Sequence, residues 1–121
     1  MNRLARHELA ERTFAARHVR LPSRWVRAST TSPFDLLVLR PDGDRLRATF
    51  VEIKTARGRR SSDLSEAEAE FGRFAETHGS PYVIARHRVV GRAATAEQLF
   101  RPFATGDARP SEVALQFEVS K

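Results

Sequence analysis

The 121-residue sequence contains no cysteine, which excludes disulfide bonds and thiolate metal sites. It also lacks an apolar run long enough to cross a bilayer, so we expect no membrane association. The first residues carry charges early and include no continuous apolar stretch, and we therefore expect no secretory signal. Because cysteine-free chains fit a reducing compartment, we predict a cytoplasmic protein.

Lysine is scarce, although the chain is strongly basic. Nineteen arginines accompany only Lys54 and Lys121, and the formal net charge is +6 with a pI of about 11.1. A small basic domain of this kind often binds a polyanion, and we predict nucleic acid, with DNA favoured over RNA. An arginine-rich composition can also reflect genome bias, so charge alone leaves the partner open. A Gly-rich phosphate loop before a helix is missing, which argues against ATP use.

The hydrophobic pattern predicts one domain over residues 1–121 with the order α-β-β-β-α-β. This order makes a mixed sheet flanked by helices, with a core over about 4–90 and an accessory helix and strand within 93–119. The expected elements are a helix over 3–18, strands over 25–28, 34–39 and 46–55, a helix from Ser65 to His78, a strand over 82–85, a short helix over 95–101 and a strand over 112–119.

Lys54 lies two residues after Glu52 in a predicted strand. Alternate residues of a strand share a face, so the two side chains point the same way. A tight turn in the hairpin would place Asp35 opposite residues 50–52. The pattern therefore brings two carboxylates and one ammonium group together at one end of the hairpin. The simpler alternatives are an exposed Glu52–Lys54 ion pair and a turn acid at Asp35.

Two neighbouring carboxylates repel each other unless a cation lies between them. We predict that Asp35 and Glu52 bind Mg²⁺ or Mn²⁺, with the carbonyl of Ile53 as a third ligand, because these hard ions prefer oxygen donors. Such an ion would polarise a phosphoryl oxygen and lower the pKa of a bound water. Lys54 would orient or deprotonate that water, or stabilise charge in the pentacovalent state. A compact, tunable ammonium suits this role better than a guanidinium.

Glu8 is a further acidic candidate in the first predicted helix. At 100° per residue it lies near the middle of an apolar arc that includes Leu4 and Val19, where an unpaired charge is costly. Glu11 lies at the edge of this arc and can be solvated. An ion pair between Glu8 and Arg12, one turn later, is the alternative.

Other polar residues have both a functional and a structural interpretation. Ser65 and Glu68 form a capping-box pattern, and we favour capping over a role in the site. Trp25 is expected in the core rather than stacked on a base. The four histidines show no zinc-type spacing, and we expect them to be structural or solvated. Predicted phosphate contacts, which can equally be solvated surface, are Arg57, Arg59, Arg60, Arg86 and Arg88.

The ordered motifs resemble the PD-(D/E)XK nuclease superfamily. They are Ser32–Asp35 and, after the hairpin, Glu52–Lys54. They are similar to NO VEIN-type C-terminal domains and to the VRR-NUC branch, with a Leu-Ser start of the second helix, over about residues 4–90. The resemblance implies a restriction-endonuclease-like core and metal-dependent phosphodiester hydrolysis. It implies Asp35 and Glu52 as metal ligands, Lys54 as the catalytic cation and Glu8 as a supporting acid.

We therefore expect a Mg²⁺-dependent nuclease acting on DNA, and a homodimer would allow two copies to cut both strands. The alternative is a catalytically silent nucleic-acid-binding or interaction module of the same fold in a defence or repair system. Such a module would bind nucleic acid in a salt-dependent manner without a metal. A third interpretation is a structural basic domain that docks on an acidic protein.

Overall fold

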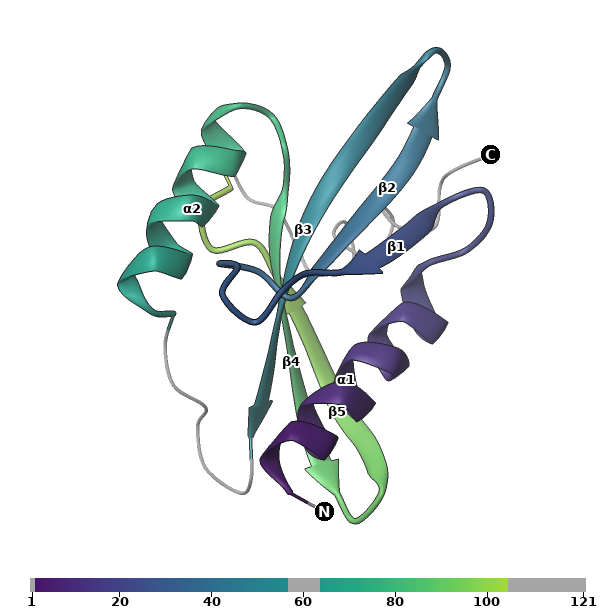
Figure 1. Cartoon of the computed structure of the whole chain (residues 1–121), viewed down its shortest axis with the longest axis vertical. Coiled ribbons are helices and arrows are strands. Elements are labelled where there is room, and N and C mark those ends of the chain that lie inside the picture. The colour runs from purple at the N-terminus through teal and green to yellow at the C-terminus, as the bar shows by residue number, and fades with distance from the viewer. Residues whose placement is uncertain (1, 57–63, 105–121) are drawn as a thin grey trace.

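Two helices and five strands follow one another in the order α-β-β-β-α-β-β (Figure 1). The structure, a computed structural model, describes residues 2–56 and 64–104. The first six elements have the predicted order. In chain order, the elements are α1 (Arg3–His18), β1 (Arg24–Arg27), β2 (Leu36–Asp42), β3 (Arg45–Ala56), α2 (Glu66–Thr77), β4 (Tyr82–Val90) and β5 (Ala93–Phe100).

The five strands form one curled, mixed sheet in the order β1-β2-β3-β4-β5. Strands β3 and β4 are parallel, and the other neighbours are antiparallel. The β2–β3 hairpin turns at Gly43, whose φ of +63° lies in the left-handed region that glycine adopts at little cost. Leu36 pairs with Val51, which places Asp35 beside Glu52 and confirms the predicted register.

Each helix covers one face of the sheet. On the α1 side, Phe14 packs with Leu36 and Val51, all fully buried, and burying side chains of this kind contributes about 1.5–3 kcal/mol each. Trp25, predicted to lie in the core, is half-buried and packs against the edge of this cluster. On the α2 side, aromatic residues dominate, and Phe50 belongs to that cluster. Alternation along β3 therefore directs Glu52 and Lys54 toward the α2 side.

The ends of α2 are fixed by local hydrogen bonds. Ser65 caps the helix by accepting from the backbone N–H of Glu68, and the Glu68 side chain accepts from the backbone N–H of Ser65, so the predicted capping box is present. Gly79, with a φ of +85°, follows the C-terminal end. The capping box at Ser65 fixes the first turn of α2, and therefore the position of Glu68, relative to the sheet.

The predicted helix over 95–101 is wrong, because these residues belong mostly to strand β5. The Gly91 turn, with a φ of +60°, reverses the chain and pairs β5 antiparallel with β4. Without this pairing, β4 would be an open edge of the sheet, and ladder formation overrides the weak local helix signal. The predicted strand over 112–119 lies outside the described residues.

A buried polar cluster ties α1 to strands β4 and β5. The two oxygens of Glu97 contact His18 Nε2 at 2.5 Å and His87 Nε2 at 2.6 Å. Burial alone would raise the pKa of Glu97, but the two imidazoles outweigh it and lower that pKa to about 2. The structural role expected for these two histidines is confirmed. Among the described residues, neither helix has the length and apolar character needed to cross a membrane.

Candidate active site

Glu52, Lys54 and Glu68 form a compact ion-pair group beneath the first turn of α2. The Lys54 ammonium lies 3.1 Å from Glu52 Oε2 and 3.1 Å from Glu68 Oε1. The same Glu68 oxygen accepts the Ser65 N–H of the capping box at 2.8 Å. Glu68 therefore both caps the helix and contacts Lys54, whereas sequence analysis favoured capping alone.

Asp35 meets this group from the chain segment that precedes β2. The Tyr82 hydroxyl donates to the carbonyl of Pro33 at 3.0 Å, and Phe34 stacks in the aromatic cluster, so the approach to Asp35 is anchored. Asp35 then joins the ladder through its N–H to the carbonyl of Val51 at 2.8 Å. Its Oδ2 accepts the N–H of Ile53 at 2.7 Å. In a strand, the N–H and C=O of one residue point the same way, so the carbonyl of Ile53 also faces this edge.

Three carboxyl groups crowd together at this point. Those of Asp35 and Glu52, and those of Glu52 and Glu68, lie within hydrogen-bonding reach. Burial and the two neighbouring carboxyls raise the pKa of Glu52 to about 10 against the opposing effect of Lys54. A cation between these carboxyl groups would offset their mutual repulsion. Buried oxygen donors with this excess of negative charge fit a hard divalent ion.

Lys54 keeps its charge in this arrangement. Burial tends to lower its pKa, but Glu52 and Glu68 outweigh burial and raise that pKa above its ordinary value. Glu68 is affected in the opposite sense: Glu52, the N–H of Ser65 and Lys54 overcome burial and lower the pKa of Glu68 to about 2. Lys54 is therefore an ammonium at neutral pH, which suits it to orienting a ligand and stabilising negative charge.

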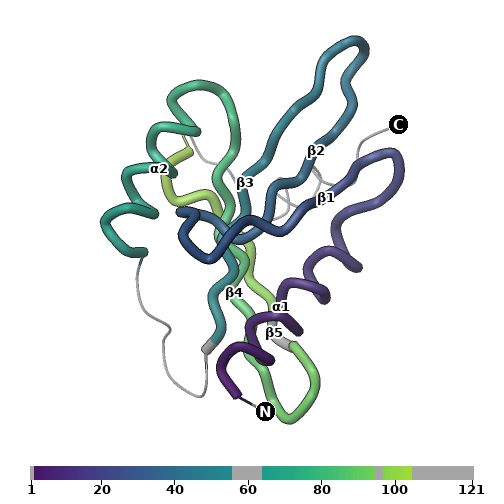
Figure 2. The backbone as a smooth tube through the Cα atoms, in the orientation of Figure 1, coloured from purple at the N-terminus to yellow at the C-terminus, as the bar shows by residue number. Residues whose placement is uncertain are grey.

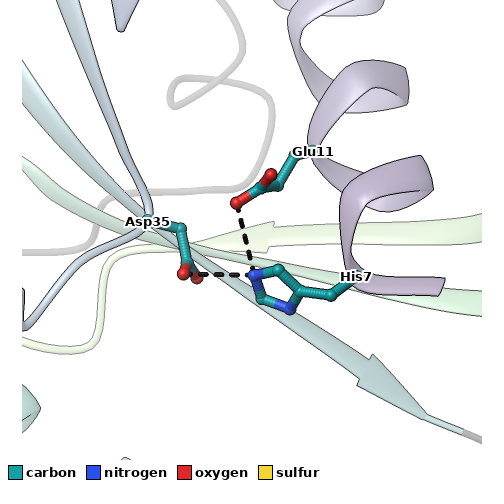
Figure 3. A group of neighbouring side chains, drawn as sticks. All are labelled: His7, Glu11 and Asp35. Carbon is teal, nitrogen blue, oxygen red and sulfur yellow. Dashed lines mark ion pairs between the residues drawn. The ribbon is translucent and has the colours of Figure 1, made fainter. Parts of the chain in front are cut away.

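His7 and Glu11 bring α1 into the same site (Figure 3). His7 Nε2 lies 3.1 Å from Asp35 Oδ1 and 3.4 Å from Glu11 Oε2. Hydrogen bonds to Asp35 and Glu11 raise the pKa of His7 to about 9. At Asp35, burial tends to raise the pKa, but bonds with His7, Glu52 and the Ile53 N–H lower it. These three residues are also close enough together to hold a metal ion.

The prediction that Glu8 lies on the apolar face of α1 is wrong, because the buried acid of this helix is Glu11. Glu11 is 3% exposed and pairs with Arg27 at 2.8 Å, whereas Glu8 is half-buried and is not among the described residues that line the site. The predicted apolar arc included Leu4, which is 64% exposed. The buried stripe instead contains Glu11, Phe14 and His18. His7 was expected to be structural or solvated, but it contacts Asp35. The helical spacing of His7 to Glu11 and Phe14 is the sequence signal that could have placed it on the face of α1 toward the sheet.

A pocket of about 510 Å³ opens over these groups. Its lining includes the side chains of His7, Asp35, Glu52, Lys54 and Glu68, together with Ile53. Helix α1, strand β3 and helix α2 thus all contribute residues to this pocket. The predicted ligands Asp35, Glu52 and Ile53 are brought together with Lys54.

Of the five arginines predicted to contact phosphate, the structure describes Arg86 and Arg88. Arg86 lies beside Lys54 in the β3–β4 register, and its guanidinium sits 5.3 Å from the centre of the Phe100 ring. Arg88 is exposed on β4 opposite Ala56. Both therefore lie on the strand next to the site. Arg57, Arg59 and Arg60 lie outside the described residues.

Comparisons with family models, with curated proteins and with solved structures find no match for this chain. The function is therefore argued from the arrangement of the side chains.

Proposed function

We propose that the chain is a metal-dependent nuclease with a restriction-endonuclease-like core that hydrolyses phosphodiester bonds, with DNA favoured over RNA. The observation that carries the proposal is the position of Lys54 Nζ, 3.1 Å from both Glu52 and Glu68, beside an Asp35 fixed by the N–H of Ile53. Carboxylates from adjacent strands and an ammonium group share one pocket. This combination suits a charged phosphoryl group better than a neutral substrate.

Asp35 and Glu52, with the carbonyl of Ile53, would hold Mg²⁺ or Mn²⁺ in this pocket. When bound there, the ion supplies Lewis-acid polarisation of the phosphoryl oxygen and a water of lowered pKa. His7 and Glu11 form a second donor set that shares Asp35. Because His7 Nε2 is bonded to both Asp35 and Glu11, the oxygen donors of Asp35, Glu52 and Ile53 are the better set for Mg²⁺ or Mn²⁺.

The residues of the chain orient the reaction. Lys54 places a positive charge where the non-bridging phosphoryl oxygens gain negative charge in the transition state. Glu68 holds this ammonium in place and is itself held by the capping box of α2. His7 contacts one oxygen of Asp35 and the Ile53 N–H donates to the other, so the orientation of this carboxylate is fixed. Positioning of this kind lowers the entropy cost of an in-line attack.

Cleavage assays test the proposal directly. Plasmid, linear and single-stranded DNA, and an RNA of matched sequence, are incubated with the protein and Mg²⁺ or Mn²⁺. We expect cleavage that disappears with EDTA and in the Lys54→Ala and Asp35→Asn variants. Asp44→Asn, at the exposed hairpin turn, is the matched control and keeps full activity. Cleavage that survives in Lys54→Ala or Asp35→Asn would refute the assignment. Metal-independent binding without cleavage would favour the silent binding module.

A further inference from the structure

A second concave surface lies at the opposite end of α2 from the candidate active site. Figure 2 shows the projecting β2–β3 hairpin and the turn that joins α2 to β4. Residues of both line a cleft of about 590 Å³. Four arginines line this arginine cleft, together with backbone of the turn and hydroxyl-bearing residues. These arginines are Arg40, Arg45, Arg47 and Arg101.

The floor of the cleft is a stretch of β3 that, within residues 2–56 and 64–104, has no strand paired on its β4 side. The pairing of β3 with β4 begins at Phe50, whose N–H donates to the carbonyl of Pro81 at 2.9 Å. Residues of the same parity, Ala48 and Leu46, direct their N–H groups to the same edge, where the described strand β4 has not yet begun. Backbone N–H groups that point toward positive side chains are a good environment for an anion.

Charges around the cleft leave it positive. Arg101 is held by Glu76 through bonds of 2.6 and 2.9 Å, so its charge is largely compensated. Arg47 pairs with Asp42, but both are exposed, and such a pair is worth at most about 1 kcal/mol and is easily replaced. The C-terminal end of α2 adds a partial charge of about −0.5. Arg45 and the replaceable Arg47 outweigh it.

We propose that the arginine cleft binds backbone phosphates of the nucleic acid whose cleavage is assigned to the site around Lys54. The inference rests on the proposed function for the identity of the ligand. Arg47 precedes Glu52 by five residues along β3, which corresponds to about 17 Å.

A peptide strand added to the open edge is the competing occupant. Charged side chains on an edge strand discourage this kind of pairing, and the cleft offers few apolar side chains to anchor a peptide. Guanidinium groups form bidentate bonds with phosphate, and the serine and threonine hydroxyls can donate as well. The chemistry of the lining therefore favours a phosphate backbone.

Binding of a fluorescent 20-base-pair duplex in EDTA tests the inference separately from cleavage. Anisotropy is measured across a salt series for the wild type and for the double variant Arg45→Gln/Arg47→Gln. The matched control is Arg12→Gln/Arg92→Gln, which removes the same charge from exposed positions elsewhere. Arg45→Lys/Arg47→Lys keeps the charge, and thermal melting establishes that each variant is folded.

We expect the cleft variant to lower the slope of log affinity against log salt by about 2, because each phosphate contact contributes about 0.9. At 0.1 M salt this corresponds to a roughly fifty-fold loss of affinity. The control and the lysine variant should keep a slope close to that of the wild type. An equal loss in the cleft and control variants, or a wild type that does not bind the duplex, would overturn the inference. If Lys54→Ala loses cleavage but keeps the wild-type salt slope of duplex binding, the phosphate contacts lie outside the site around Lys54, as the inference requires.

Discussion

Helix α1 carries two histidines that each contact a carboxylate, and the two clusters differ in how their charges are balanced. Around Glu97, one carboxylate meets two buried imidazoles, and the half-exposed Arg17 guanidinium lies 3.8 Å from one of its oxygens. Around His7, carboxyl groups are in excess: four of them contact Lys54, Arg27 and a single imidazole. The imidazoles of the first cluster are buried, and the second cluster lines a pocket.

This difference separates a structural cluster from a candidate active site. A buried charge group that is balanced within itself needs no further partner and stabilises the packing of α1 on the sheet. A group with surplus carboxylate and an opening to solvent can gain free energy by binding a cation. Similar residue types thus have different consequences, because their number and their access to solvent differ.

The largest expected effect is on catalysis and distinguishes the two clusters. Asp35→Asn should lower the cleavage rate by about 10²–10³-fold or more, because it removes a ligand and an oriented charge from the site. Glu97→Gln should leave the rate per folded molecule within about twofold of the wild type. Initial rates under single-turnover conditions, normalised to the folded fraction, measure both. Equal losses in the two variants would remove the distinction.

The next effect is on stability and has the opposite pattern. Glu97→Ala leaves two buried imidazoles without their shared acceptor, and we expect a loss of about 3 kcal/mol in the free energy of unfolding. Gln98→Ala, at the exposed neighbour, should change stability by less than about 0.5 kcal/mol. Urea denaturation monitored by circular dichroism measures both. A loss below about 1 kcal/mol for Glu97→Ala would show that the cluster does not stabilise the fold.

The smallest effect is a pH dependence that belongs to His7. Its pKa is raised from about 6.5 to about 9 by Asp35 and Glu11, so its contribution is complete below pH 6.5 and is lost as pH rises through about 9. In EDTA, the stability advantage of the wild type over His7→Gln should therefore shrink between pH 6.5 and 9.5. An advantage that grows with pH would contradict the assigned contacts.

Local and register-based features could be predicted from the sequence. The hairpin turn determined which residues face each other, so Asp35, Glu52 and Lys54 were placed together correctly, and the capping box located α2. The buried face of α1 could not be read from apolar residues alone, since its stripe contains Glu11 and His18 and omits Leu4. Strand β5 was missed because its structure depends on pairing with β4, which is a tertiary effect.

Anomalous diffraction from crystals soaked in Mn²⁺ tests the central claim most directly. The account predicts a peak between the carboxylates of Asp35 and Glu52 near the carbonyl of Ile53, and its disappearance in Asp35→Asn crystals. It predicts none at Glu97, whose oxygens are already bonded to His18 and His87. A soaked crystal without a peak at Asp35, or with its strongest peak at Glu97, would contradict the proposed metal site.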